Sequence, residues 1–230
     1  MEYKYKSYAK INSYLNVMSK LDNGYHEILT HFQIIDLYDE VSYKESDALL
    51  INSNEKTIKN NNSITKTIEW FNEKYGVNQK FETKIKKTIP VGAGLGGGSS
   101  NAAIALRFLA KFHNIQIKDI DTTDIALALG ADVPVFVHKK SCYASGIGDI
   151  LGKSSFNSSE YLLICPQIFV STQNLYKSTY LKFQNIENKE INSFLSVLIE
   201  ENKEFKDFYD LLRSQLPNKT FEKLKLSGTG

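Results

Sequence analysis

The sequence is poor in cysteine, in arginine and in long apolar runs. Its two cysteines, Cys142 and Cys165, form neither a CxxC pair nor a metal-ligand spacing, which argues against a disulfide scaffold and a cysteine zinc site. Both lie in apolar segments, so we expect buried thiols. No apolar stretch approaches the roughly 20 residues that span a bilayer, and the N-terminus has no hydrophobic signal core. We therefore expect a cytoplasmic protein without a membrane partner.

Arginine occurs only at Arg107 and Arg213, and the net charge of the chain is +2. Proteins that read nucleic acids favour arginine for base edges and cluster their positive charge. This chain shows neither feature, so we expect no nucleic-acid partner. The histidines show no zinc-ligand spacing either, and we predict no metal site made by protein side chains alone. With 42% hydrophobic and 23% charged residues, the chain has the composition of a globular protein with a real core.

Apolar periodicity predicts an α+β protein with two domains, residues 1–150 and 151–230. In the first domain we expect strands at residues 3–9, 14–17, 32–37, 41–44, 48–51, 81–89, 133–137 and 142–144. Helices are expected there at residues 64–75, 99–112 and 122–129. In the second domain we expect strands at 161–165 and 168–170 and helices at 173–181, 190–200 and 204–216. The polar residues 153–159 mark the predicted boundary.

A glycine-rich segment is the most informative feature of the sequence. Residues 92–98 contain five glycines and connect a predicted strand to a helix that begins with hydroxyl residues. Glycine allows positive φ and leaves backbone N–H groups accessible, and a helix N-terminus carries partial positive charge. These groups would converge on one point, which is how proteins hold polyphosphate. A flexible linker is the alternative, but linkers are polar and this segment lies between two apolar elements. We therefore predict a phosphate-binding loop.

The glycine-rich segment fits the patterns of two well-known phosphate-binding loops poorly. A Walker A loop has Lys and then Ser or Thr after its last glycine, whereas here Gly97 is followed by Gly98 and Ser99. Gly92, Gly94 and Gly97 do match the dinucleotide-binding pattern. That pattern also requires a long apolar strand after the helix, and none is visible. The sequence therefore indicates a phosphate loop of another kind.

Three further segments contain polar residues at positions where they would not stabilise a strand or a helix. Lys10 and Asn12 share one face of a predicted strand, although a solvated face would look the same. Tyr25 and His26 follow a tight turn, where they form either a surface for a heterocycle or simply a packed hairpin. Asp132 lies between apolar segments, and a carboxylate there needs a partner or a chemical role.

Together these motifs resemble those of the GHMP small-molecule kinases. The segments are AKIN at residues 9–12, DNGYHE at 22–27, PVGAGLGGGSSNAA at 90–103, GADVP at 130–134 and SGTG at 227–230. Their order and approximate spacing match that superfamily over nearly the whole chain. Two of them, NGYH and GADVP, are similar to those of the members that phosphorylate the 2-hydroxyl of 4-diphosphocytidyl-2-C-methyl-D-erythritol in non-mevalonate isoprenoid synthesis. The resemblance implies a GHMP kinase fold, with an N-terminal domain like the second domain of ribosomal protein S5 and a ferredoxin-like C-terminal domain.

The resemblance also implies catalytic residues. The aspartate that matches Asp132 takes the proton from the substrate hydroxyl, and the lysine that matches Lys10 steadies that carboxylate and the developing alkoxide. A base and a cation suit phosphoryl transfer, because this reaction depends on positioning and charge stabilisation more than on covalent chemistry.

For the acceptor, the resemblance implies an aromatic site. Tyr25 and Tyr176 match positions whose rings sandwich cytosine. His26 matches a residue that hydrogen-bonds the cytosine, and Asn12 matches one that lines the acceptor pocket.

For the nucleotide, the resemblance implies ATP with Mg²⁺. Lys87 and Asn62 fall near positions that border adenine. The loop that wraps the ATP phosphates corresponds to Pro90, Val91, Gly92, Ala93, Gly94, Leu95, Gly96, Gly97, Gly98, Ser99, Ser100 and Asn101. The loop has no carboxylate, so we expect the metal to be held mostly by phosphates, water and a loop hydroxyl.

Two alternatives remain open at this point. Another GHMP kinase, such as a homoserine or mevalonate kinase, would share the loop, but Tyr25 and His26 argue against it. A nucleotide-binding module without catalysis is the second, because family members continue past the SGTG motif with a strand and a helix while this sequence stops at Gly230. We therefore expect an incomplete second domain, an SGTG segment beside the glycine loop, and a monomer or homodimer that acts on a small molecule.

Overall fold

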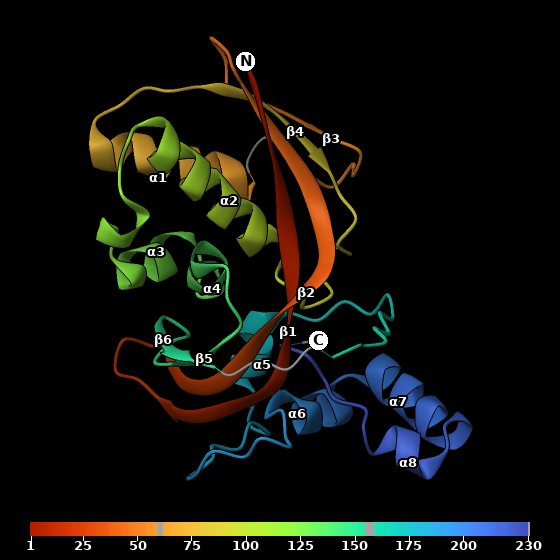
Figure 1. The fold of residues 1–230 in the computed structure, drawn as a ribbon. Coiled ribbons are helices and arrows are strands. Elements are labelled where there is room, and N and C mark those ends of the chain that lie inside the picture. Colours follow the sequence, from red (N-terminus) through yellow and green to blue (C-terminus); the bar gives the residue numbers. More distant parts are fainter. Residues whose placement is uncertain (59–61, 155–158, 230) are drawn as a thin grey trace.

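The fold is that of a computed structural model, which describes residues 1–58, 62–154 and 159–229 (Figure 1). Its strands are β1 (Glu2–Lys20), β2 (His26–Glu45), β3 (Leu50–Ser53), β4 (Phe81–Lys86), β5 (Cys142–Ser145) and β6 (Ile150–Lys153). Its helices are α1 (Ser63–Tyr75), α2 (Gly97–Phe112), α3 (Thr122–Leu129), α4 (Val133–His138), α5 (Thr172–Lys177), α6 (Phe194–Glu201), α7 (Lys203–Gln215) and α8 (Asn218–Phe221), with a 3₁₀ turn at Ile117–Asp119.

One mixed sheet organises the molecule, in the strand order β3-β4-β2-β5-β6 with β1 paired to β2. All its pairs are antiparallel except β3 with β4. Helices α1 to α4 lie on one side of the long β1–β2 ribbon, and α5 to α8 gather near its lower end (Figure 1). The predicted α+β class is therefore confirmed. Among the described helices, none is long and apolar enough to cross a membrane.

The strands β1 and β2 form a long antiparallel hairpin, so the short strands expected before residue 45 merge into two. The turn at residues 22–24 forms as predicted, closed by the Leu21 N–H donating to the Tyr25 carbonyl at 2.8 Å. The strand register shifts after Tyr8 and again after Asn12. Such bulges bend a strand and redirect its side chains. The AKIN segment at residues 9–12 lies between the two shifts.

The main core lies between the sheet and helices α1 to α4. Tyr43 of β2 and Phe108 of α2 stack with ring centres 4.3 Å apart, and Phe81 of β4 meets Phe108 edge-on at 4.8 Å. These rings are almost completely buried. Alternating inward residues of the strands and the apolar stripe of α2 thus meet as their periodicities predict.

A second apolar cluster joins the far half of the hairpin to the C-terminal helices. Its buried members are Leu15, Val17, Ile28, Leu175, Phe194, Val197, Leu198 and Phe205. The hairpin therefore contributes to both clusters. The proposed division of the chain at residue 150 stays a prediction.

Residues 133–137, expected as a strand, form helix α4 instead. The Val-Pro-Val-Phe-Val sequence has high β-propensity, but Pro134 lies in the first turn, where its missing N–H costs nothing. All five residues are buried, and α4 packs on α2, so tertiary packing overrides the local preference. That strand prediction was wrong.

The strands expected at residues 161–165 and 168–170 are also absent from the described chain. Leu162 is 89% exposed and Phe169 is 87% exposed, so these apolar side chains are not packed into a core as a buried strand would pack them. Cys165 is exposed rather than buried, which corrects that expectation. Cys142 is buried as predicted, and burial raises the pKa of its thiol to about 11. Part of the predicted boundary at 153–159 lies outside the described residues.

The other helices agree with the sequence pattern within a few residues, although α5 ends at Lys177 and α6 begins at Phe194. The N-cap of α1 is Asn62. Asn62 accepts hydrogen bonds from the backbone N–H groups of Ile64 and Thr65.

Phe108→Ala should lower the free energy of unfolding by about 3–5 kcal/mol, because it removes a buried ring and leaves a cavity. Leu127→Ala is the control, since Leu127 is 51% exposed and its loss should cost about 0.5 kcal/mol or less. Urea unfolding followed by circular dichroism measures both. Equal losses would show that the Phe108 ring is not part of the core.

Candidate active site

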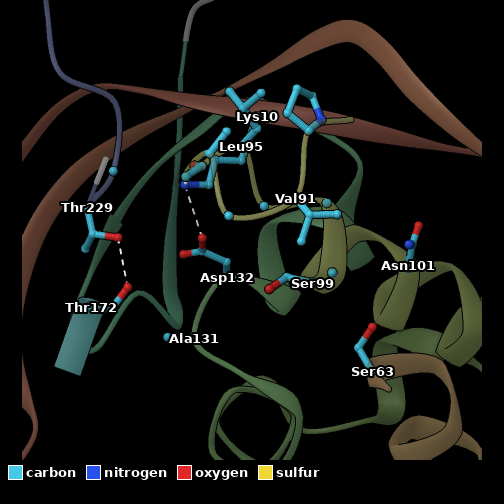
Figure 2. Close-up of a pocket in the computed structure, with 18 of the residues that line it drawn as sticks. Lys10, Ser63, Val91, Leu95, Ser99, Asn101, Ala131, Asp132, Thr172 and Thr229 are labelled. Carbon is cyan, nitrogen blue, oxygen red and sulfur yellow. Dashed lines mark hydrogen bonds and ion pairs between the residues drawn. The ribbon is translucent and has the colours of Figure 1, made fainter. Parts of the chain in front are cut away.

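A cavity of about 600 Å³ opens beside the glycine loop. Its walls come from residues 90–99 of the loop, from β1, from the start of α1 and from the segment before α4. The C-terminal segment closes one side through Thr229 (Figure 2). Parts of the chain that are far apart in sequence therefore converge on one space.

The ammonium group of Lys10 holds this site together. Lys10 Nζ donates to Asn12 Oδ1 at 2.6 Å and to the Gly94 carbonyl at 3.0 Å. It also lies 3.1 Å from Asp132 Oδ2 (Figure 2). The Lys10 side chain is 4% exposed, whereas that of Asp132 is 35% exposed. The cation is thus buried and fixed while the carboxylate stays open to a ligand.

Asn12 extends this network into the sheet. Its Nδ2 donates to Thr30 Oγ1 at 2.7 Å, and Thr30 donates in turn to the Tyr14 carbonyl at 2.6 Å. Lys10 and Asn12 share one face of the strand, as predicted, and both are buried, so this face is not a solvated one. Thr30 was missed by the sequence analysis, because a threonine in a strand carries no signal of its own.

The glycine loop is attached to β1 and leads directly into α2. The Lys10 N–H donates to the Leu95 carbonyl at 3.0 Å. Gly96 is the N-cap of α2 with φ of 68°, and a Cβ there would lie 2.8 Å from Phe136 Cζ. Only glycine fits this close approach at this backbone conformation. The structure therefore explains why the helix begins with glycine.

Two polar residues at the start of α2 take different positions. The hydroxyl of Ser100 is buried and accepts a hydrogen bond from Ser7 at 2.7 Å, and it does not line the cavity. Asn101 does line the cavity and is 3% exposed. Its Oδ1 has no hydrogen-bond partner within residues 1–58, 62–154 and 159–229. A buried acceptor without a partner is costly, so Asn101 is a group that a ligand could satisfy.

The aromatic residues expected to hold a base are only partly brought together. Tyr176 of α5 lines the cavity, and its ring stacks on His26 with centres 4.8 Å apart and planes at 29°. Burial, with the nearby Asp132 charge, raises the pKa of the Tyr176 phenol. Tyr25 is 45% exposed at the hairpin turn and does not line the cavity. The ring that faces Tyr176 is therefore His26 and not Tyr25.

The SGTG segment lies beside the glycine loop, as predicted. The Asn12 N–H donates to Ser227 Oγ at 2.9 Å. A Cβ on Gly228 would lie 3.2 Å from the Gly94 carbonyl oxygen and 3.4 Å from Lys10 Nζ. The hydroxyls of Thr172 and Thr229 are hydrogen-bonded at 2.9 Å (Figure 2). The last residue of the motif, Gly230, lies outside the described residues.

Asn62 and Lys87, the two residues predicted to border adenine, both line the cavity. Lys87 forms an ion pair with Asp39, whose side chain is fully buried. The sequence analysis missed Asp39. Its signal was the period of the strand, since Asp39 shares the inward face with Val41 and Tyr43. No group of three or more potential metal-ligating side chains occurs in the described part of the chain.

The fold and the loop define the class of this protein, a GHMP kinase, and GHMP kinases use ATP. The family model described as the GHMP kinases N terminal domain matches residues 62–140. The crystal structure of a 4-(cytidine 5'-diphospho)-2C-methyl-D-erythritol kinase superposes with a TM-score of 0.72 and 24% identity, over 99% of this chain and 87% of that one.

Curated relatives narrow the class. A 4-diphosphocytidyl-2-C-methyl-D-erythritol kinase of Francisella philomiragia is 36% identical over 232 residues, which is 98% of this chain and 84% of the relative. The kinase of the same name from Francisella tularensis subsp. novicida is 38% identical over 240 residues, which is 99% of this chain and 84% of the relative. The chain belongs to the 4-diphosphocytidyl-2-C-methyl-D-erythritol kinase family.

Gly96→Ala should lower the free energy of unfolding by about 1–3 kcal/mol, because the new Cβ meets Phe136 and the positive φ is strained. Gly98→Ala is the matched control. Gly98 lies in the first turn of α2, and a Cβ there meets only Ser63 Oγ at 3.9 Å. It should leave stability unchanged or raise it by up to about 1 kcal/mol. Denaturant midpoints decide, and a stable Gly96→Ala protein would contradict the assigned loop geometry.

Proposed function

We propose that this chain transfers the γ-phosphoryl group of ATP to the 2-hydroxyl of 4-diphosphocytidyl-2-C-methyl-D-erythritol. The observation that carries the proposal is the 3.1 Å ion pair between Lys10 and Asp132 at the edge of the glycine loop. It supplies a base and a cation beside a loop suited to phosphate. The curated relatives carry the name of this activity.

The cavity suits ATP on three counts. A ligand can approach the loop backbone closely. A Cβ added to Gly92 would meet no atom within 4 Å, and one added to Gly98 would meet only Ser63 Oγ at 3.9 Å. The helix α2 begins at the loop and directs its free N–H groups and its dipole toward the cavity. The unpartnered Oδ1 of Asn101 needs a donor, and ATP offers an adenine amino group and ribose hydroxyls. Asn62 and Lys87 complete the nucleotide side of the cavity.

In the proposed reaction, Asp132 accepts the proton of the acceptor hydroxyl as the oxygen attacks the γ-phosphorus of ATP. The carboxylate makes no capping hydrogen bond to α4, and its side chain is 35% exposed beside Lys10, so the acceptor hydroxyl can reach it. Lys10 stabilises the alkoxide as charge develops on it, and the loop N–H groups stabilise the phosphoryl oxygens. Mg²⁺ would enter with ATP and neutralise phosphate charge, held by the phosphates, water and a loop hydroxyl such as that of Ser99.

The acceptor base would bind near Tyr176 and His26. Burial and the neighbouring Lys20 lower the pKa of His26, so its imidazole is neutral at pH 7 and can both donate to and accept from a cytosine edge. Because His26 covers one face of Tyr176, a base that stacks there must share or displace it. Tyr25 would complete the sandwich from the hairpin turn. A cytoplasmic location and a monomeric or homodimeric state belong to the same proposal.

Asp132→Asn should bind ATP normally and lose turnover by about 10²–10⁴-fold, because the amide keeps the shape of the carboxylate and lacks its basic lone pair. Lys10→Ala should also lose turnover. A coupled assay of ADP release measures the rate, and calorimetry measures ATP binding. Asp124→Asn, at an exposed carboxylate on α3, is the control and should remain active. Near-normal turnover of Asp132→Asn at saturating acceptor would mean that another group is the base.

Tyr176→Ala should raise the Kd of the acceptor by the equivalent of about 1–3 kcal/mol, because it removes one stacking face, and should spare ATP. Tyr176→Phe keeps the ring and should bind the acceptor almost as well as the unchanged protein. Tyr25→Ala tests the second ring in the same way. Calorimetric titration with each ligand is the measurement, and equal losses for ATP and acceptor would show that Tyr176 is a structural residue.

A further inference from the structure

Two lysine–acid pairs bridge β2 and the end of β4 side by side, and they face opposite sides of the sheet. Glu40 pairs with Lys86 in the strand register, and its ion pair of 3.2 Å is exposed. One step further along, Asp39 meets Lys87 on the inward face. The Asp39 side chain is 0% exposed and that of Lys87 is 7% exposed. Removing two charges from water costs free energy, so the buried Asp39–Lys87 pair needs a compensating interaction or a role in function. The exposed Glu40–Lys86 pair needs neither.

The Asp39 carboxylate organises the segment that leads into the glycine loop. Its Oδ1 accepts hydrogen bonds from the backbone N–H groups of Thr88 and Ile89 at 2.8 and 3.0 Å. Its Oδ2 accepts from Lys87 Nζ at 2.5 Å. Both oxygens are therefore occupied, and one side chain binds the backbone of two residues and the ammonium of a third, all immediately before Pro90.

The ammonium that Asp39 holds lies against the start of α2. Lys87 Nζ is 3.1 Å from the position that a Cβ on Gly97 would take, and Lys87 lines the cavity. A cation beside a helix N-terminus is unfavourable, because the helix dipole places positive charge there. An anion bound in the cavity would be attracted both by the Lys87 ammonium and by the N-terminus of α2, and would reduce the repulsion between them. Lys87 thus faces the phosphate end of the loop.

We propose that Asp39 is a positioning residue for ATP: it holds the Lys87 ammonium at the phosphate-binding end of the cavity and fixes the backbone that enters the glycine loop. This inference rests on the proposed function and deepens it. It assigns Lys87 to the charge of the polyphosphate, although its place in the family pattern is near adenine.

The test measures binding of ATP, AMP and inorganic tripolyphosphate by calorimetry for Asp39→Asn, Lys87→Met and the double variant. Each variant should bind ATP and tripolyphosphate about tenfold more weakly, because a charge-assisted contact is lost or misplaced, while AMP is affected much less. Lys87→Arg, which keeps the charge, should retain most of the affinity. The KM for ATP should rise with little change in the KM for the acceptor.

The exposed pair supplies the matched controls. Glu40→Gln and Lys86→Met remove the charges of the neighbouring acid and lysine in the same way, and they should leave binding of all three ligands unaffected. If Asp39→Asn does not fold because it strands the Lys87 charge, the double variant decides, since it leaves no unpaired buried charge.

Two results would overturn the inference. One is a loss of AMP affinity equal to that of ATP with tripolyphosphate unchanged, which would place Lys87 at the base. The other is a lower thermal midpoint with unchanged binding of all ligands, which would make the pair purely structural. Failure of the unchanged protein to bind ATP would instead refute the proposed function itself.

Discussion

The arrangement of the site depends on the buried ammonium of Lys10. An ammonium has three donors and no acceptor, and away from water each donor needs a partner. Here the partners are Asn12 on the same strand, the Gly94 carbonyl of the loop and the Asp132 carboxylate before α4. One side chain therefore sets the distances among three separate segments. Lys10 lies on the stretch of β1 between two register shifts, where bulges bend a strand and redirect its side chains.

Two lysine–aspartate pairs flank the glycine loop, and their burial separates their roles. Lys10 and Asp132 meet near Gly94, while Lys87 and Asp39 meet near Gly97. Asp132 keeps 35% of its side chain exposed, whereas Asp39 is completely enclosed and saturated with donors. Only the first carboxylate is open to a substrate proton. The second is enclosed, and both of its oxygens already accept hydrogen bonds from the segment that leads into the loop.

The sequence predicted most of the residues that meet at the cavity, but it predicted the strands less completely. The glycine loop, Lys10, Asn12 and Asp132 were all predicted, because each is a polar or glycine residue in a place where a regular element gains nothing from it. Residues 133–137 were read as a strand because β-propensity is a weak preference, and burial of α4 against α2 outweighs it. The strands expected after residue 160 failed because an apolar run forms a strand only where a neighbour shares its hydrogen bonds.

By itself the sequence determined the elements with strong local signals: the amphipathic helices, the turn at residues 22–24 and the loop that requires glycine. The tertiary structure alone decided which polar groups meet. It placed Thr30 beneath Asn12, turned Asp39 toward Lys87, and set His26 rather than Tyr25 against Tyr176. The reason is physical: backbone preferences are local and readable along the chain. A hydrogen bond or ion pair between distant residues exists only after the sheet and helices have packed and removed both groups from water.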